Sequence, residues 1–514
     1  MKIKLNSWLA KQHEQKKSAA AAANSVSRRE MFTWFLIFFS FYTMCREWDT
    51  LPSLHIMWSP GVLIDMANAD QEIVRNRKIS GTVNSTSASM LDESNNARTL
   101  QPNNKIKCNK GEASDLCNMV GDIRIDPDAT TVYYVIPPKT DVILIAGDDT
   151  DNTTTTTTSS SWTIKPYART DDASAMALVS EWSVKMVSPA GNDHQHLPNC
   201  THVHDPPGVF FSLGGYSGNH YHGFTDVLIP LFVTSRPFDR QVELLVIDSQ
   251  PWMVNKVKKI MQALSRYDEV DIDRSSKQDG KIHCFSRLVM GLKGRGKKEL
   301  GISPLETDYT MKDFRQFLRS AYSLSKTTAI KLRTDDDDEG DKKNLMMNNP
   351  QLLIISRKGS RAFTNVNEIA GMATKLGYDV KVVEPDDKTM SQSAEMMNSC
   401  DVVVGVHGAG LTNMVFLPDN AVVVQVIPLA LDWSAKIYYE EPTKEMNLRY
   451  LQYKIKKEES SLMGRYSPDH VVFTTPWSFK WEEFRSIYMQ NQNVTVDLRR
   501  FRPTLVKALE LLHH

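Results

Sequence analysis

Short apolar runs alternate with amphipathic segments along the last third of the chain. The clearest run is Val402–Val406, similar runs occupy residues 351–355 and 422–427, and a further strand that includes Asp379 and Lys381 is predicted at 378–383. Short apolar runs bounded by glycine or polar residues are typical of buried parallel strands. Between them, a helix is predicted after Asn365, with Glu368 in the capping-box position, and another at 390–398. This alternation of strand and helix predicts a doubly wound parallel sheet.

The part of the chain before residue 331 carries a second set of predicted elements. Strands are predicted at 121–125, 131–136 and 242–247, a strand, glycine turn and helix at 209–234, and a helix at 309–319. A charged stretch at 331–349 is typical of a solvated loop between domains. We therefore predict an α/β protein with domains at 108–330 and 350–514, joined by a linker at 331–349. The last apolar helix, residues 505–512, is expected to pack back on the body.

Composition narrows the class of protein. At 514 residues the chain is too long for one core, so two folded domains with appendages are expected. Lys and Arg total 61, and so do Asp and Glu, which gives a net charge of zero. This balance argues against a nucleic-acid-binding protein, which normally carries a basic domain or stripe. The hydrophobic content of 41% is that of a globular chain rather than a disordered one.

An apolar stretch near the N-terminus predicts a membrane anchor. Residues 1–30 are rich in Lys and Arg, and residues 31–45 are rich in Phe and hold no charge. A spanning helix usually needs about 20 residues, so this one is short. A cleaved signal peptide is the alternative, but the basic region is long and no small-residue cleavage site follows it. We predict a signal-anchor at 31–45 with the basic tail in the cytosol, and a lumenal stem at 46–107 before the folded domains.

Sequons and cysteines agree with a lumenal location. Sequons occur at Asn84, Asn152, Asn199 and Asn493. Disulfides can form in an oxidising lumen, and the favoured pairs are Cys108 with Cys117 and Cys200 with Cys284. Connectivity does not follow from sequence alone, so these pairs are hypotheses. Cys400 adjoins a buried strand and is expected to be a core thiol.

A group of histidines surrounds Cys200. The histidines are His194, His196, His202 and His204. Histidine and cysteine ligands suit zinc, but this spacing fits no common zinc finger. A surface loop is therefore the favoured interpretation.

A glycine-rich turn follows the strand at Val402–Val406. Gly408 and Gly410 let the backbone turn tightly and approach a ligand closely, and His407 lies at the mouth of the turn as a donor. A helix predicted at 411–416 would point its free N–H groups at the turn, which predicts an anion site at the carboxyl end of a strand. An ordinary strand–turn–helix corner is the alternative. The glycine order does not meet the dinucleotide fingerprint, so a nicotinamide enzyme is not expected.

A basic loop follows the strand at 351–355. Arg357, Lys358 and Arg361 place three cations within five residues at the carboxyl end of that strand. Arg can bind a phosphate through two parallel N–H bonds, so the loop suits a diphosphate. A basic loop alone is usually only solvated, but this loop shares its domain with the glycine turn.

The segment at 401–418 resembles the hallmark of glycosyltransferase family 61. Other segments that are similar to the family lie at 162–169, 209–232, 282–293, 309–319 and 356–365, and the resemblance runs from about Cys108 to the C-terminus. The family includes plant xylan arabinosyltransferases and xylosyltransferases, and distant animal relatives that transfer N-acetylglucosamine. The resemblance implies a GT-B fold, in which two Rossmann-like domains face a cleft.

The resemblance also implies a set of site residues. The second domain would hold a UDP-sugar through Arg357, Lys358, Arg361, Asn365, His407, Gly408, Gly410 and Asn413. The first domain would present the acceptor beside Gly215, Tyr216 and Asn219. His222 and Asp226 are four residues apart on a predicted helix and share one face, so the pair can act as a general base on a sugar hydroxyl. Which of the two takes the proton is open, and an ion pair on a helix surface is the alternative.

The implied function is an inverting transfer of an arabinofuranosyl or xylosyl unit from a UDP-sugar to xylan, in cell-wall synthesis. Cations and helix N-termini would stabilise the departing diphosphate, so no metal cofactor is required. The implied setting is the Golgi membrane, as a single-pass type II protein, with homo- or hetero-oligomers of Golgi glycosyltransferases left open. The alternatives are a transferase of the same family that adds xylose or N-acetylglucosamine to N-glycans or proteins, and a non-catalytic, lectin-like lumenal protein.

Overall fold

The computed structural model describes most of the chain after residue 104. The described residues are 105–111, 113–136, 161–188, 197–274, 280–293, 299–305, 307–332, 349–384 and 389–513. They belong to one compact unit, Thr99–His514. The predicted tail, anchor, sequons Asn84 and Asn152, His194 and His196 lie outside these residues, as do most of the stem and linker. Within the described ranges, no helix combines the length and apolar character that crossing a bilayer requires.

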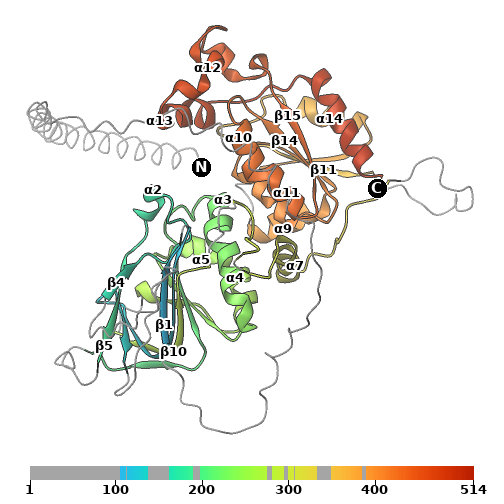
Figure 1. Ribbon diagram of the computed structural model, residues 1–514. Helices are drawn as coiled ribbons and strands as arrows, with labels where there is room; N and C mark the ends of the chain where they lie inside the picture. The colour runs from blue at the N-terminus through green and yellow to red at the C-terminus, as the bar shows by residue number, and fades with distance from the viewer. Residues whose placement is uncertain are drawn as a thin grey trace, which may run out of the picture. The chain divides into compact units, whose positions relative to one another are not determined.

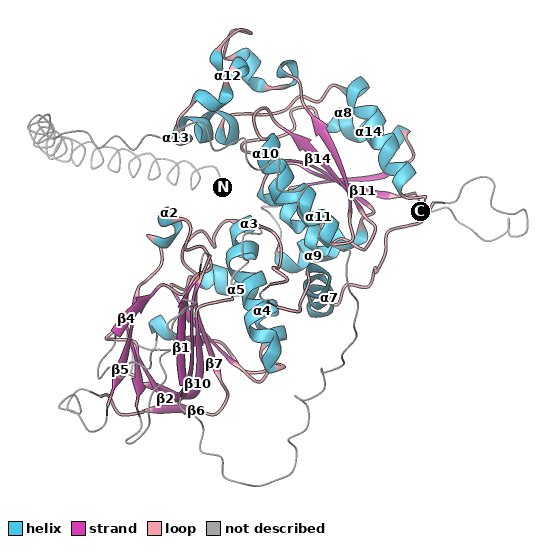
Figure 2. Cartoon of the chain, viewed as in Figure 1, coloured by secondary structure: helices cyan, strands magenta, loops and turns pink. Residues whose placement is uncertain are grey.

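The C-terminal half is built on a sheet of five parallel strands (Figures 1 and 2). The strands are β11 (Gln351–Ile355), β12 (Asp379–Val383), β13 (Val402–Val406), β14 (Val422–Ile427) and β15 (Arg449–Lys454). Every residue of β13 and β14 is buried, as expected for central strands covered on both faces. The parallel pairing confirms the predicted doubly wound sheet for this half.

The strand order of this sheet is β12-β11-β13-β14-β15, so the direction of winding reverses between β11 and β13. In open α/β sheets, ligands bind outside the carboxyl ends of the strands at such a switch point. The basic loop follows β11, and the glycine turn follows β13. The topology therefore brings the two predicted anion-binding motifs to the same edge of the sheet.

Helices cover this sheet, and two of them test the sequence predictions directly. The predicted helix at 390–398 is α9 (Met390–Ser399). The final helix, α14 (Leu498–Leu511), packs on β14, β15 and α8 (Val366–Lys375) with Phe501, Leu505 and Ala508 buried. The prediction that the last helix returns to the body is confirmed.

Asn365 lies at the N-cap position of α8, but its side chain does not cap the helix. Its carboxamide nitrogen donates to the carbonyl oxygen of Val496 (2.9 Å), and its oxygen accepts from the Val496 N–H (3.0 Å). The predicted capping box is therefore wrong. Two hydrogen bonds to the backbone of Val496 satisfy both ends of the amide, whereas a helix cap would use only its oxygen, so the side chain holds the 494–496 segment instead.

The N-terminal half is built on a mixed sheet of ten strands. The strands are β1 (Lys105–Lys110), β2 (Asp115–Asp126), β3 (Thr131–Val135), β4 (Ser161–Ile164), β5 (Trp182–Val187), β6 (His202–His204), β7 (Gly208–Ser212), β8 (Glu243–Ile247), β9 (Val270–Asp271) and β10 (His283–Met290). Strands β10, β7, β8 and β9 are parallel, whereas β2 pairs antiparallel with β1, β3 and β10. Only part of this half thus has the parallel winding that a Rossmann-like domain implies.

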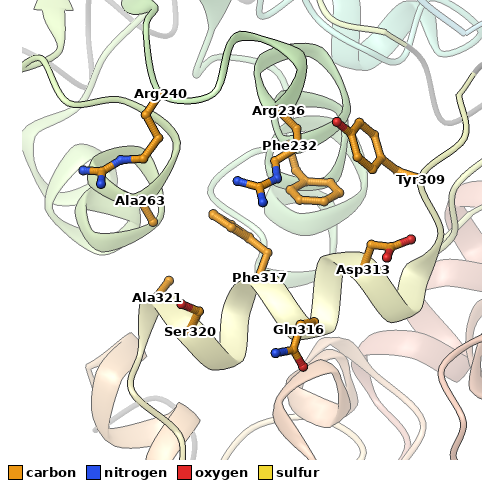
Figure 3. A pocket seen from close by; sticks show the side chains of 10 residues that line it. All are labelled: Phe232, Arg236, Arg240, Ala263, Tyr309, Asp313, Gln316, Phe317, Ser320 and Ala321. Atoms are coloured by element: carbon orange, nitrogen blue, oxygen red, sulfur yellow. The ribbon is translucent and has the colours of Figure 1, made fainter.

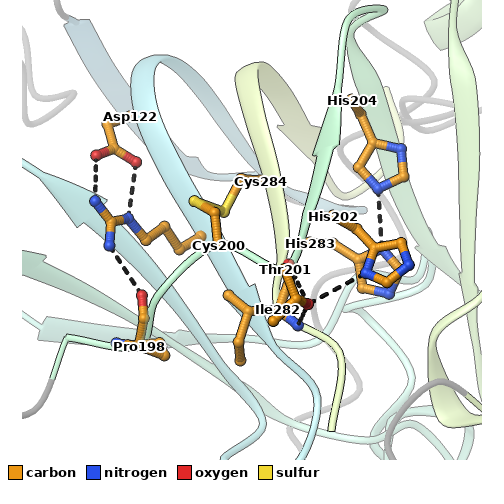
Figure 4. The surroundings of a disulfide bond; sticks show 10 residues. Asp122, Pro198, Cys200, Thr201, His202, His204, Ile282, His283 and Cys284 are labelled. Atoms are coloured by element: carbon orange, nitrogen blue, oxygen red, sulfur yellow. Dashed lines mark hydrogen bonds and ion pairs between the residues drawn. A yellow bond between two sulfur atoms is a disulfide. The ribbon is translucent and has the colours of Figure 1, made fainter. Parts of the chain in front are cut away.

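Two disulfides confirm both predicted cysteine pairs. Cys108 and Cys117 face each other across β1 and β2, and Cys200 is joined to Cys284 of β10 (Figure 4). Cys400 is free and buried, as predicted.

The predicted surface loop is wrong for His202 and His204, because they lie on the strand β6, which pairs with β10 beside His283 (Figure 4). His204 bonds His283 through its Nε2 (2.9 Å) and Glu243 through its Nδ1 (2.6 Å). Across the described ranges, no three His, Cys, Asp or Glu side chains form a group that could hold a metal ion.

Helix α7 (Met311–Ala321) connects the two halves. Phe314 and Phe317 pack against Phe232 of the N-terminal half, with ring centroids 5.3 and 5.2 Å away. On the same helix, the buried Arg315 donates to the carbonyl oxygens of Val415, Leu417 and Met446 and to the carboxylate of Asp419. A cavity of about 540 Å³ lies beside α7, with the exposed Arg236 and Arg240 among its lining residues (Figure 3).

Candidate functional site

The glycine turn after β13 is packed directly against the basic loop. A Cβ atom on Gly408 would come within 2.3 Å of Nη1 of Arg357 and 3.2 Å of Nη1 of Arg361, and Gly408 has φ +155°. Only glycine leaves room for the two guanidinium groups at this point. The carbonyl oxygens of the turn are held as well, because His407 accepts from Arg361 (3.1 Å) and Gly408 from the Tyr439 hydroxyl (2.8 Å).

Arg357 and Arg361 form a pair of like charges without a neutralising carboxylate. In the described part of the chain, neither side chain makes an ion pair with Asp or Glu. Burial, followed by the charge of Arg357, lowers the pKa of Arg361 to about 10, and its Nε is buried without a hydrogen-bond partner in the same part. Arg361 also adopts a left-handed backbone, with φ +54°. Two converging cations held in this way are suited to a multiply charged anion such as a diphosphate.

His407 faces inward. Its Nδ1 is 2.7 Å from Nε2 of Gln425, and its Nε2 is 3.3 Å from Oγ of Ser434. The Gln425 carboxamide oxygen accepts from the Tyr450 hydroxyl, so its nitrogen is left to donate to His407 and the imidazole proton lies on Nε2. Burial, followed by the charges of Arg361 and Arg357, lowers the pKa of His407 to about 3. The ring is therefore neutral at neutral pH, and its hydrogen bonds to Gln425 and Ser434 fix the glycine turn on its buried side.

The segment after the turn is a 3₁₀ helix, η8 (Ala409–Phe416), rather than the predicted helix at 411–416 with free N–H groups. The N–H of Leu411 already bonds the carbonyl oxygen of Gly408 (3.0 Å). Asn413, predicted to bind the nucleotide sugar, is buried and donates to the Gly410 carbonyl oxygen (3.1 Å). Its oxygen accepts from Nε2 of His220 (3.0 Å), which lies in the N-terminal half.

The remaining residues predicted for the nucleotide sugar lie around this turn in different roles. Lys358 is exposed and pairs with Glu384 at the end of β12. Gly410 is half-buried at the start of η8, and the amide of Asn365 is occupied by Val496. The structure thus brings Arg357, Arg361 and Gly408 into one cluster, and their binding of a nucleotide sugar stays a prediction.

The predicted pair His222 and Asp226 is present. Nδ1 of His222 lies 3.1 Å from Oδ2 of Asp226. The predicted helix over this segment is interrupted, because α3 (His220–His222) continues as a π-helical segment, η4 (Gly223–Leu228), before α4 (Ile229–Ser235). Short π-helical segments are rare and frequently occur at functional sites. The pair is not on a helix surface, since Asp226 is fully buried and the His222 side chain is 25% exposed.

Asp226 accepts four hydrogen bonds, three of them on Oδ2. Its Oδ2 also accepts from the Tyr167 hydroxyl (2.9 Å) and Nε of Arg169 (2.8 Å), and its Oδ1 accepts from Oγ1 of Thr225 (2.7 Å). Burial alone would raise the pKa of Asp226, but the hydrogen bonds from His222 and Arg169 outweigh it and lower this pKa to about 2. Asp226 is therefore an ionised carboxylate that holds the Nδ1–H of His222. In the described part of the chain, Nε2 of His222 makes no hydrogen bond.

The predicted acceptor-side residues build the loop that precedes His222. Gly215 has φ +56°, and a Cβ atom there would lie 2.6 Å from the ring of Tyr167. The N–H of Tyr216 donates to the Tyr167 hydroxyl (3.1 Å), and the Tyr216 ring meets the His222 ring edge-on at 5.0 Å. Asn219 caps α3 by accepting from the Tyr221 N–H (2.9 Å). A role for these residues in acceptor binding stays a prediction.

Aromatic residues join the His222 side of the site to the His407 side. The Tyr221 ring lies 5.2 Å from the Tyr438 ring and 6.0 Å from the Tyr439 ring. The Tyr221 hydroxyl donates to Glu299, which also accepts from Arg169 (both 3.2 Å).

The contacts between Asp226 and the side chains of Tyr167 and Arg169 were not predicted. The only sequence signal for them was the resemblance of the 162–169 segment.

Two of the predicted glycosylation sites are described. Asn199 is exposed on the loop before β6. Asn493 is half-buried, and its carboxamide oxygen accepts from the Ala362 N–H (3.0 Å). Modification of either residue stays a prediction.

Comparison with known proteins gives a consistent set of relatives. The model of the family described as Glycosyltransferase 61 matches residues 220–424. "Alpha-1,3-arabinosyltransferase XAT3" of Oryza sativa subsp. japonica is 37% identical over 405 residues, covering 78% of this chain and 64% of the relative. "Beta-1,2-xylosyltransferase XYXT1" of the same organism is 37% identical over 418 residues, covering 80% and 85%. "Xylan glycosyltransferase MUCI21" of Arabidopsis thaliana is 31% identical over 494 residues, covering 95% and 93%. The chain spans less than two thirds of the length of the arabinosyltransferase and most of the length of the other two.

The low pKa of His407 predicts a pH-dependent stability. The pKa is about 3 in the folded protein and about 6.5 in an unfolded chain, so the unfolded state binds the extra proton between these values. The contribution of the neutral His407 to the free energy of unfolding is fully present above pH 6.5, where the imidazole is neutral in both states. It is lost as the pH falls toward 3, by about 1.4 kcal/mol per pH unit. Unfolding midpoints measured from pH 8 to 4 should fall less steeply below pH 6.5 for His407→Gln than for the wild type. Parallel curves for the two proteins below pH 6.5 would contradict the assignment, and their parallel course above pH 7 serves as the control.

Proposed function

The chain belongs to glycosyltransferase family 61, and from this premise we propose that it is an inverting glycosyltransferase that transfers a pentose from a UDP-sugar to xylan. One observation carries the proposal. At the switch point of the C-terminal sheet, Arg357 and Arg361 converge without a neutralising carboxylate in the described part of the chain, and on the N-terminal side His222 is oriented by the buried Asp226. The arginine pair suits binding of a nucleoside diphosphate, and the histidine suits deprotonation of an acceptor hydroxyl. The names of the arabinosyl- and xylosyltransferase relatives support arabinose or xylose as the sugar, and the name of the Arabidopsis relative supports xylan as the acceptor.

On the donor side, the proposal assigns the diphosphate to the cluster of Arg357, Arg361 and Gly408. The absence of a side chain on Gly408 lets the phosphate oxygens approach the backbone beside both guanidinium groups. Negative charge develops on the diphosphate as the bond to the sugar breaks, and fixed cations stabilise that charge without reorganising. These side chains, rather than a bound metal ion, are proposed to carry the leaving-group charge.

On the acceptor side, the proposal makes His222 the general base and Asp226 its positioning residue. Asp226 is a poor proton acceptor, because it is fully buried and its hydrogen bonds lower its pKa to about 2. It holds His222 with the proton on Nδ1, which leaves the Nε2 lone pair for the acceptor hydroxyl. Nε2 removes the hydroxyl proton while the oxygen attacks the anomeric carbon. The bond to UDP breaks on the opposite face, which inverts the configuration at that carbon.

The cellular setting is part of the same proposal. We propose a GT-B enzyme that is anchored as a single-pass type II protein in the Golgi membrane, with the folded part in the lumen. The basic tail and the uncharged stretch at 31–45 support the anchor. The two disulfides support an oxidising compartment.

The direct test is a transfer assay. Purified protein is incubated with xylo-oligosaccharides and with UDP-arabinofuranose, UDP-xylose or UDP-N-acetylglucosamine, and the products are analysed by mass and by the configuration of the new linkage. One pentose added from one donor with inversion is expected. UDP binding without transfer would point to another acceptor, and the absence of both transfer and UDP binding would favour a non-catalytic protein.

The catalytic pair makes a second prediction. His222→Ala should lower kcat by about 10³ with little change in UDP affinity, because it removes the base but not the donor site. Added imidazole should restore part of the turnover. Asp226→Asn should also lower kcat, since a neutral amide no longer holds the Nδ1 proton of His222. Near-normal turnover in both variants, with UDP binding intact, would show that the assignment is wrong.

The glycine turn offers a matched pair of variants. Gly408→Ala should weaken UDP binding by at least about tenfold, because the new methyl group would displace the Arg357 guanidinium. Gly359→Ala lies in the adjacent basic loop with no atom within 4 Å of its added Cβ, so its UDP affinity should equal that of the wild type. Calorimetric titration with UDP checks both variants. Equal affinity for the two would remove the turn from the donor site.

A further inference from the structure

A series of aromatic rings leads away from the proposed base. Tyr221, next to His222, contacts Tyr438 at 5.2 Å between ring centroids. Tyr438 contacts Trp433 of α10 (Asp432–Ala435) at 5.8 Å, and Trp433 contacts Trp477 at 6.5 Å. The series therefore starts in the site and continues without a break along the C-terminal half.

The outer end of the series is an exposed surface, which we call the tryptophan strip and define as Trp433, Trp477 and Trp481. These side chains are 38%, 59% and 54% exposed. Trp477 and Trp481 both stack on the buried Phe484, at 5.1 and 6.0 Å and with interplanar angles of 18° and 13°. Three large aromatic side chains left in contact with water on one face are costly for a soluble domain and mark an interaction site.

The strip rests on a packed base and is therefore held in place before any ligand arrives. Its tryptophans lie on α10, η12 (Pro476–Ser478) and α13 (Trp481–Phe484), and α12 (Val471–Thr474) is part of the same region (Figure 1). Beneath them, the side chains of Leu431, Leu462, Val472 and Tyr488 join Phe484 in a separate buried cluster. Large rigid side chains on a fixed base lose little conformational entropy on binding.

The charges around the strip are balanced. Asp432 pairs with Lys454 (2.8 Å), and Glu482 pairs with Arg485 (3.4 Å). A membrane-binding surface would gather Lys and Arg instead, so the strip does not suit an anionic lipid surface. Flat aromatic faces within a neutral polar rim match a sugar chain, whose rings have an apolar C–H face and a rim of hydroxyl groups.

We propose that the tryptophan strip binds the acceptor polysaccharide beyond the sugar unit that reacts, as an extended subsite for a neutral glycan chain. The inference rests on the proposed function, which places the reacting hydroxyl at His222. The series of ring contacts connects the strip to Tyr221, the residue next to His222. An acceptor long enough to reach the strip gains contacts that a short acceptor does not have.

The experiment compares a short and a long acceptor on the full chain. Binding of xylobiose and xylohexaose to the wild type and to the double variant Trp477→Ala/Trp481→Ala is measured by calorimetry. The double variant should bind xylohexaose about tenfold more weakly, whereas its affinity for xylobiose and for UDP should not change. Leu305→Ala removes a 94% exposed apolar side chain outside the strip and should behave as the wild type.

Several outcomes would overturn the inference. Equal affinity of the wild type and the double variant for xylohexaose would do so, as would a wild type that binds no xylohexaose. Loss of binding to phosphatidylserine vesicles, or of self-association, with unchanged affinity for xylohexaose would assign the strip to a membrane or to a second copy of the chain. The proposed function fails separately, through absence of transfer in the wild type. A loss of xylohexaose binding in the double variant would still support the strip in that case.

Discussion

One desolvated carboxylate organises the acceptor side of this protein. Asp226 is fully buried, and an unpaired charge at such a position would be strongly destabilising. Its donors come from two distant stretches: Tyr167 and Arg169 follow β4, whereas His222 ends α3 and Thr225 lies on the π-helical segment η4. The need to satisfy this charge explains why Gly215 lacks a side chain, since the Tyr167 ring must pass beside it to reach Asp226. The same group of hydrogen bonds to Asp226 both satisfies its buried charge and orients the ring of His222.

The two halves of the site differ in how their charges are satisfied. On the N-terminal side the Asp226 carboxylate accepts four hydrogen bonds and thereby orients the His222 ring, whose Nε2 makes none in the described part of the chain. On the C-terminal side Arg357 and Arg361 converge on Gly408 without a carboxylate, and Nε of Arg361 is buried without a partner in the described part. The hydrogen bonds around Asp226 orient a proton acceptor, whereas the arginine pair provides positive charge that suits an anion. His220 and Asn413 bond across the boundary between them, so the two arrangements are aligned by direct contact.

Local patterns predicted much of this structure. The β-branched run Val402–Val406, the four-residue spacing of His222 and Asp226, and the cations after β11 are each visible within a few residues, and each prediction of position held. Contacts between residues far apart in the sequence could not be predicted from it. Arg169 reaches Asp226 across 57 residues and Glu299 across 130, and no periodicity encodes such a pairing. His407 was expected to lie at the mouth of the glycine turn as a donor, but its ring bonds the buried Gln425 of the adjacent strand instead. The antiparallel pairs of β2 were missed because the sequence of a strand does not reveal which strands it pairs with or in which direction.

The buried Arg315 has a consequence for how the molecule can be divided. The charged stretch at 331–349 looks like the natural place to cut the chain into two autonomous domains. Such a cut would leave α7 with the first fragment and the carbonyl groups of Val415, Leu417 and Met446 with the second. The first fragment would expose a buried guanidinium, and the second would lose the donor that bonds these three carbonyl oxygens. The unit of folding therefore crosses the linker, and the two sheets are halves of one cooperative body.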